Sequence, residues 1–256
     1  MSASAQAVAF SSGMVTRAFA LSVVLVLASS SMARAQDTPT EEESSATTLP
    51  DRPTSGDFSI SSGRTLGIRR KALAAGIGWP GVWAEFDTGL SSRFTLGVRA
   101  TVLYGSPLLG FGNGIGGELS VPIRLHIYGH QDLDVSIALR PAIVMGQGSL
   151  VGLTNTFRND FGFGVRGEGG LLLGMRLTDA VTFVLGVNGG LGFNSVPDAE
   201  RSHVLALIRG VIGVEALVSR DTMLFAVADG GYGFAPSDTY EKHVIVGLSL
   251  GLAYEL

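Results

Sequence analysis

The side chains of this chain that could do chemistry are arginines and carboxylates at alternate positions, opposite rows of apolar residues. Residues spaced by two share one face of a β-strand. The planar fork of an arginine guanidinium matches a carboxylate, so strands of this kind predict cross-strand ion pairs. The residues assigned to this predicted polar network are Glu85, Asp87, Arg99, Glu118, Arg124, His126, Asp134, Arg140, Arg166, Glu168, Arg176, Asn188, Arg209 and Glu215.

Three glycine-rich segments match motifs of enzymes and nucleotide-binding proteins. Residues 247–251 fit G-x-S-x-G, which needs a strand-to-helix turn with an acid and then a histidine downstream, but no histidine follows them. Residues 112–117 and 162–167 fit G-x-G-x-x-G, which binds a dinucleotide where it opens a helix. All three lie in strand-like sequence. We therefore expect no bound cofactor and no catalytic residue among them.

Side chains of the hydrolase type also occur, but their spacing is unfavourable. Glu118, Ser120 and His126 share one face of a predicted strand, and a lipid hydrolase could use such residue types. His126 lies six residues from Ser120, which is roughly 20 Å along a strand. The four histidines show no spacing typical of metal ligands. We expect no metal and no enzymatic activity.

Alternation of apolar and polar residues dominates the chain from about residue 65. It is clearest between residues 243 and 256, where every second residue is Val, Leu or Tyr. The pattern predicts an all-β fold of about ten strands, with eight as the alternative count. The predicted strands are 66–78, 82–90, 93–105, 114–127, 132–145, 160–177, 180–193, 203–218, 222–234 and 243–256.

The predicted connections alternate in length. Short ones lie at 90–93, 128–131, 177–180 and 219–222, and longer ones at about 106–113, 146–159, 194–202 and 235–242. This alternation is typical of a transmembrane antiparallel up-and-down β-barrel, which has short periplasmic turns and longer outer loops. Pro122 and Pro141 fall inside predicted strands, where each removes a hydrogen-bond donor, so we expect a bulge, or a strand end near Pro141.

The beginning of the chain has the three parts of a secretory signal. Arg17 precedes an apolar run at 18–28, and a small-residue cleavage site follows at 33–35. We expect cleavage before Gln36, with Met1 and Met14 as alternative starts. Residues 1–35 are thus assigned to a signal peptide, residues 36–64, rich in Ser, Thr, Pro and acids, to a disordered periplasmic tail, and residues 65–256 to a barrel domain.

The composition excludes several classes of function. Cleavage would remove two of the 18 basic residues and none of the 22 acidic residues, so the net charge of the mature chain would be −6. A nucleic-acid partner is not expected at that charge. The chain has no cysteine, which excludes disulfides and thiolate metal sites. Only 16% of its residues are charged, a small share for a soluble β-protein but an ordinary one for a barrel that turns apolar side chains toward lipid.

Aromatic spacing gives a check on strand length. Phe94 and Tyr104 share one face ten residues apart, as do Phe183 and Phe193. Ten residues span roughly 33 Å of strand, and a tilt near 40° projects this to about 25 Å, the height of the apolar band of a membrane barrel. Together with Tyr254, these residues form a predicted lipid-facing aromatic girdle.

In these features the chain resembles the broad class of small bacterial outer-membrane β-barrel proteins over residues 65–256. The resemblance rests on the last strand, with Leu256 at the final position and Tyr254 third from the end. In that class a terminal aromatic residue, usually Phe, helps the barrel assembly machinery to recognise the strand, and Leu256 departs from this. The resemblance implies an outer-membrane location, outer-membrane lipid as surroundings and the barrel assembly machinery as a partner during biogenesis. It leaves the oligomeric state open.

Three functional hypotheses follow. The first is a non-enzymatic integral barrel, which is either structural, with a salt-bridged interior, or a narrow passive pore with a charged lining. The second is an outer-membrane hydrolase that modifies lipid. The third is a soluble periplasmic barrel that turns its Leu and Val rows inward around an apolar ligand.

Overall fold

The computed structural model describes residues 58–106, 114–130, 132–147, 160–196, 201–234 and 242–256. The predicted signal peptide and residues 36–57 of the predicted tail lie outside them. Within these ranges, no helix is long and apolar enough to cross a membrane. The strands are β1 Lys71–Trp79, β2 Gly81–Ser91, β3 Phe94–Leu103, β4 Gly116–Ser120, β5 Ile123–His130, β6 Leu133–Gln147, β7 Phe161–Arg176, β8 Val181–Val196, β9 Arg201–Leu217, β10 Thr222–Phe234 and β11 Lys242–Glu255.

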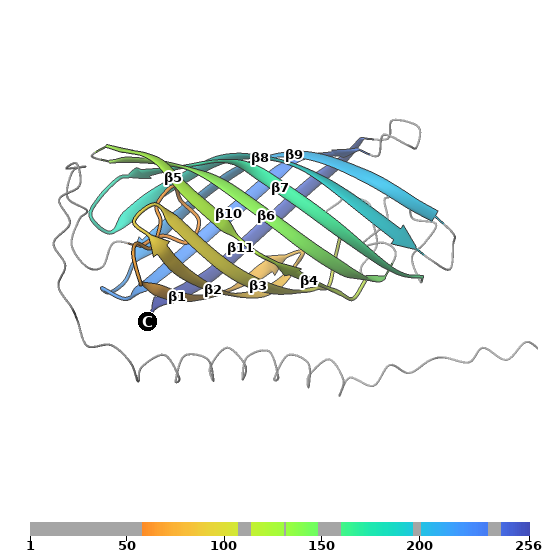
Figure 1. The fold of residues 1–256 in the computed structure, drawn as a ribbon, viewed down its shortest axis with the longest axis horizontal. Coiled ribbons are helices and arrows are strands. Elements are labelled where there is room, and N and C mark those ends of the chain that lie inside the picture. Colours follow the sequence, from red (N-terminus) through yellow and green to blue (C-terminus); the bar gives the residue numbers. More distant parts are fainter. Residues whose placement is uncertain (1–57, 107–113, 131, 148–159, 197–200, 235–241) are drawn as a thin grey trace, which may run out of the picture. The chain divides into compact units, whose positions relative to one another are not determined.

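Hydrogen bonds between neighbouring strands close the sheet into a barrel (Figure 1). All the pairings are antiparallel, and β1 pairs with β11 from Ala72 opposite Glu255 to Trp79 opposite Leu248. β4 and β5 both pair with β3 and with β6, so these two short strands share one place in the ring. The ring therefore has ten places, and the predicted antiparallel up-and-down barrel of about ten strands is confirmed.

The break between β4 and β5 falls at Pro122, which has no N–H to continue the ladder. The register with β6 is the same on both sides of the break, so Pro122 interrupts the hydrogen bonding without the bulge that we expected. β6 continues through Pro141, and the alternative of a strand end there is wrong. The irregularity in the pairing of β5 with β6 lies instead between His126 and Tyr128.

The two ends of the barrel differ. The four predicted short turns, which join β2 to β3, β5 to β6, β7 to β8 and β9 to β10, lie at one end, here called the turn end. The C-terminus also lies at the turn end, because Tyr254 of β11 pairs with Thr222 at the start of β10. The opposite end is the loop end, where β1 and β2 are joined through Pro80. The four longer connections fall largely outside the described residues.

Side chains alternate between the barrel interior and the outer surface. In β11, Leu248, Leu250 and Leu252 are 50%, 51% and 46% exposed, whereas Ile245 and Ala253 are 3% and 0% exposed. The apolar row between residues 243 and 256 therefore lies on the outside. The soluble-barrel hypothesis, which turned this row inward, is contradicted.

Residues 58–66, here called the inner segment, are packed inside the barrel. Phe58, Ile60 and Leu66 are 3%, 5% and 0% exposed. They form one apolar cluster with wall residues that include Met223 and Phe225. The assignment of residues 58–64 to a disordered tail is therefore wrong. The first strand also begins later than predicted, at Lys71 instead of residue 66, because Leu66 belongs to this interior packing and residues 67–70 form a turn with positive φ at Gly67 and Arg69.

Shortening one apolar side chain of the inner segment tests this packing. We expect Leu66→Ala to lower the free energy of unfolding by about 2–5 kcal/mol, because it leaves a cavity in a fully buried cluster. Ile68→Ala is the matched control, since Ile68 is 60% exposed, and its effect should stay within about 0.5 kcal/mol. Denaturant unfolding in detergent micelles measures both. Equal effects of the two substitutions would contradict the buried position of Leu66.

Candidate functional site

Charged side chains of the barrel wall form two groups in the interior. The first group contacts the inner segment near the turn end, and the second surrounds a cavity further toward the loop end. The strand alternation places these side chains inside, because each occupies a position of the inner row. In both groups, guanidinium groups form ion pairs with carboxylates of other strands.

In the first group, the wall satisfies the backbone of the inner segment. One carboxylate oxygen of Glu215 on β9 accepts the backbone N–H groups of Ile60 at 3.0 Å and Ser61 at 2.5 Å. Arg124 on β5 donates to the backbone carbonyl of Ser59 at 2.8 Å and to the carboxylate of Asp87 at 2.8 Å. The side chains of Arg124 and Asp87 are 4% and 1% exposed. Buried backbone needs such partners, so these two wall residues allow a non-strand segment to lie inside the barrel.

Further contacts hold the far part of the inner segment. Arg64 forms an ion pair with Asp134 of β6, and Nε2 of His126 lies 3.1 Å from the same carboxylate. The hydroxyl oxygen of Thr95 accepts the backbone N–H of Leu66 at 3.1 Å. The inner segment is therefore bound to three adjacent strands, β3, β5 and β6, and to β9 further around the ring.

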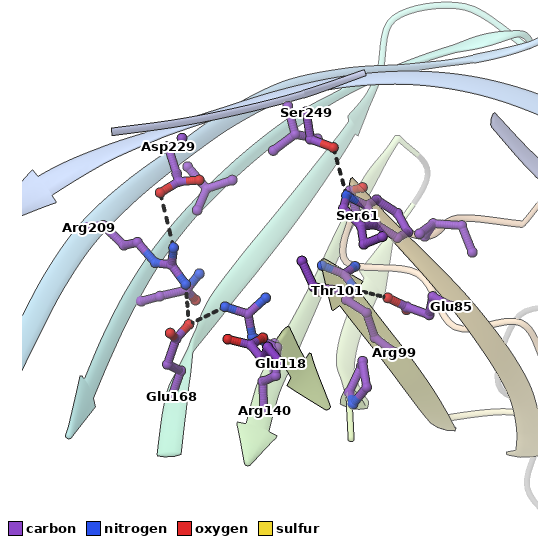
Figure 2. A pocket seen from close by; sticks show the side chains of 18 of the residues that line it. Ser61, Glu85, Arg99, Thr101, Glu118, Arg140, Glu168, Arg209, Asp229 and Ser249 are labelled. Atoms are coloured by element: carbon purple, nitrogen blue, oxygen red, sulfur yellow. Dashed lines mark hydrogen bonds and ion pairs between the residues drawn. The ribbon is translucent and has the colours of Figure 1, made fainter. Parts of the chain in front are cut away.

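The second group is a chain of alternating charges (Figure 2). Arg140 of β6 lies directly opposite Glu168 of β7, and the two side chains approach to 2.8 Å. Arg209 of β9 forms ion pairs with Glu168 and, at 3.1 Å, with Asp229 of β10. Four strands are thus linked by three ion pairs through the middle of the interior. A guanidinium between two carboxylates is well suited to this, because its donors point in several directions.

Two more ion pairs complete the second group. Arg99 pairs with Glu85 across β2 and β3, and its guanidinium carbon lies 4.0 Å from the ring centre of Trp83, within the range of a cation–π contact. Arg166 lies 3.7 Å from Glu118, which is too long for a hydrogen bond. Trp83 also donates its indole N–H to the hydroxyl of Ser249 at 2.9 Å.

The second group lines a cavity of about 270 Å³. The inner segment contributes Ile60 and Ser61 to its lining, and the β1–β2 hairpin at the loop end contributes Trp79 and Pro80. The charged residues around it are Glu85, Arg99, Glu118, Arg124, Arg140, Arg166, Glu168, Arg209 and Asp229.

Most members of the predicted polar network lie in one of the two groups. Glu85, Arg99, Glu118, Arg140, Arg166, Glu168 and Arg209 belong to the second, and Asp87, Arg124, His126, Asp134 and Glu215 to the first. Asn188 lines the cavity without a charge of its own. Arg176 ends β7 at the turn end, where its backbone N–H donates to the carbonyl of Asp132.

The sequence analysis missed two charged residues of these groups. Asp229 occupies an inner-row position of β10, two residues from Val227, so the alternation of that strand could have identified it. Arg64 has no such signal, because it lies in the inner segment, which has no strand periodicity.

The predicted aromatic girdle lies on the outer surface. Tyr104, Phe193 and Tyr254 are exposed, and Phe94 and Phe183 are half-buried among outward neighbours. Phe94, Phe183 and Tyr254 lie near the turn end and the other two near the loop end. The five residues thus lie on the outer surface, near its two ends.

The described residues do not contain the arrangement of side chains that the hydrolase hypothesis requires. The hydroxyl of Ser120 is buried and has no hydrogen-bond partner among the described residues, and the same is true of Ser136, which lies opposite His126. A serine nucleophile needs a hydrogen bond to its base. The described ranges also contain no group of three His, Asp or Glu residues that could hold a metal ion.

Comparisons with known proteins found solved structures of similar fold but no related sequence. No protein-family model matches the chain, and no curated protein matches its sequence. Among solved structures, the crystal structure of Ail, the attachment invasion locus protein of Yersinia pestis, is similar at 11% sequence identity and a TM-score of 0.35, over 74% of this chain and 100% of that chain. The structure of Ail in complex with the heparin analogue sucrose octasulfate has the same identity and coverage, with a TM-score of 0.36.

The role of Glu168 in the second group can be measured directly. Glu168→Gln keeps the shape of the side chain but leaves Arg140 and Arg209 without their shared carboxylate. We expect the free energy of unfolding to fall by roughly 3–5 kcal/mol, because a buried ion pair is broken from one side. Asp179→Asn, in the exposed turn after β7, is the control and should change stability by less than about 0.5 kcal/mol. Denaturant titrations measure both variants. If the two variants are equally stable, the ion pairs of Glu168 with Arg140 and Arg209 do not contribute to the stability of the barrel.

Proposed function

We propose that this protein is a non-enzymatic, integral outer-membrane β-barrel with a structural role, whose interior is closed, so that it does not act as a passive pore. The single observation that carries the proposal is the division of the barrel into two surfaces. Apolar side chains cover the outside, while paired charges and the inner segment occupy the inside and leave a cavity among the charges of the second group.

The outer surface supports a lipid environment. Large apolar side chains are exposed on strands around the barrel; examples are Ile77, Val98, Leu119, Ile137, Leu171, Leu191, Ile212, Leu224 and Leu250. A soluble protein rarely exposes a continuous apolar surface of this extent. In a membrane, a closed barrel satisfies its backbone internally and can present such a surface to hydrocarbon.

The interior supports a closed state. Near the turn end, the inner segment is held by Glu215 and Arg124 and packs through Phe58 and Leu66. Further toward the loop end, the arginines and carboxylates of the second group are paired with one another. Solute passage would require breaking these buried pairs, which carries a free-energy cost of several kcal/mol per ion.

A charge on the outer surface tests the membrane location. Leu250→Arg, near the middle of the outward row of β11, should lower the stability of the barrel in lipid by about 2–4 kcal/mol. Leu90→Arg, at the turn end of β2, is the control and should cost about 0–1 kcal/mol, because a charge there reaches the membrane surface. Unfolding titrations in lipid vesicles measure both variants, and gel mobility with and without boiling confirms that each barrel forms. Equal small effects, or recovery of the wild-type protein in the aqueous periplasmic extract, would contradict the proposal.

Conductance distinguishes a closed interior from a passive pore. We expect the wild-type protein in planar lipid bilayers to show no steady channel current. Glu215→Ala combined with Glu168→Gln should produce current, because the double variant removes both the acceptor of two backbone N–H groups of the inner segment and the carboxylate shared by Arg140 and Arg209. Asp179→Asn should behave like the wild type, since Asp179 lies in an exposed turn. Steady current through the wild type would support the passive pore instead.

A further inference from the structure

We propose that the cavity in the second group is a binding site for a small zwitterion, with an ammonium group that contacts Glu118 and an anionic group that contacts the neighbouring arginines. This inference goes beyond the proposed function, which requires only that the interior be closed. It rests on the hydrogen-bonding capacity that remains in the cavity wall and on the balance of its charges.

Glu118 provides the site for a cation. Its side chain is only 9% exposed, and its nearest ion-pair partner, Arg166, lies 3.7 Å away. The carboxylate therefore accepts no close hydrogen bond from the described residues, although it lines the cavity (Figure 2). A buried carboxylate is strongly disfavoured without a donor. An ammonium group in the cavity would supply up to three donors.

The arginines provide the site for an anion. A guanidinium has five N–H donors, and the contacts of Arg140 with Glu168 and of Arg209 with Glu168 and Asp229 use only some of them. A carboxylate in the cavity could accept donors that the wall itself does not use.

The charges of the wall favour a zwitterion over a simple ion. Arg124 is committed to Asp87. The other charged residues of the lining are four arginines and four carboxylates, namely Arg99, Arg140, Arg166 and Arg209 with Glu85, Glu118, Glu168 and Asp229. A simple ion would lose its hydration without a net opposite charge to compensate it. A zwitterion meets complementary charges at both of its ends.

The size of the cavity fits a small ligand. Its volume of about 270 Å³ lies just below the usual range of small-molecule pockets, about 300–1,000 Å³. The same volume would hold about nine water molecules at roughly 30 Å³ each. The lining extends to Trp79 and Pro80 of the β1–β2 hairpin, so the cavity reaches the loop end.

The chain carries its own reporter for binding. It has two tryptophans, Trp79 and Trp83, and both line the cavity. Intrinsic tryptophan fluorescence of the refolded barrel in detergent can therefore be titrated with three probes of similar length: 4-aminobutyrate, which has both charges, butyrate, which has only the anion, and butylamine, which has only the cation. We expect 4-aminobutyrate to give a saturable change and to bind at least about tenfold more tightly than either single-charge probe, since each lost charge-assisted contact costs about one order of magnitude.

A substitution tests the role of Glu118. Glu118→Gln keeps the side-chain shape but removes the charge, and should weaken 4-aminobutyrate at least about tenfold while leaving butyrate unchanged. Asp179→Asn, far from the cavity lining, is the matched control and should bind like the wild type. If the substituted barrel fails to fold, the comparison of the three probes on the wild type still decides the question. Absence of a saturable change, or equal affinity for all three probes, would overturn the proposal and leave a cavity filled with water only.

Discussion

The pairing of β1 with β11 is the interaction on which the rest of this structure depends. It joins the first and last strands over eight residue pairs, from Ala72 opposite Glu255 to Trp79 opposite Leu248. Without it the sheet would have two open edges with unpaired backbone groups, which a membrane does not tolerate. With it, every strand has two neighbours, and the alternation of side chains along each strand separates an inner row from an outer row. One row is enclosed and must be packed or paired, while the other row faces the surroundings.

The enclosed row explains why the barrel carries so many arginines and carboxylates. Buried ion pairs contribute little net stability, because the loss of hydration offsets much of their attraction. A buried charge without a partner is much worse, so once Glu168 is inside, Arg140 and Arg209 become necessary. The same reasoning applies to the inner segment. Its backbone can be buried only because Glu215 and Arg124 of the wall supply an acceptor and a donor.

The strands were predictable from the sequence because the period of two is a local property. The predicted strand ends agree with the structure to within a few residues from β2 onward, and the outward row of β11 lies outside as expected. Two local features misled. Pro122 was expected to cause a bulge, but the neighbouring strands hold the register, so it only interrupts the hydrogen bonding. Residues 58–64 lack periodicity and are rich in serine, so they appeared to be a tail.

The sequence by itself determined the fold class, the approximate number of strands and which side chains lie inside, because each follows from alternation along a single strand. Only the tertiary structure decided which charges meet. Ion pairs such as Arg209 with Glu168 join strands that are distant in sequence and depend on the register of the whole ring. The tertiary structure also decided that residues 58–66 enter the barrel, because their partners, such as Glu215 and Met223, belong to strands near the other end of the chain. A contact between segments more than 150 residues apart leaves no local pattern from which it could be predicted.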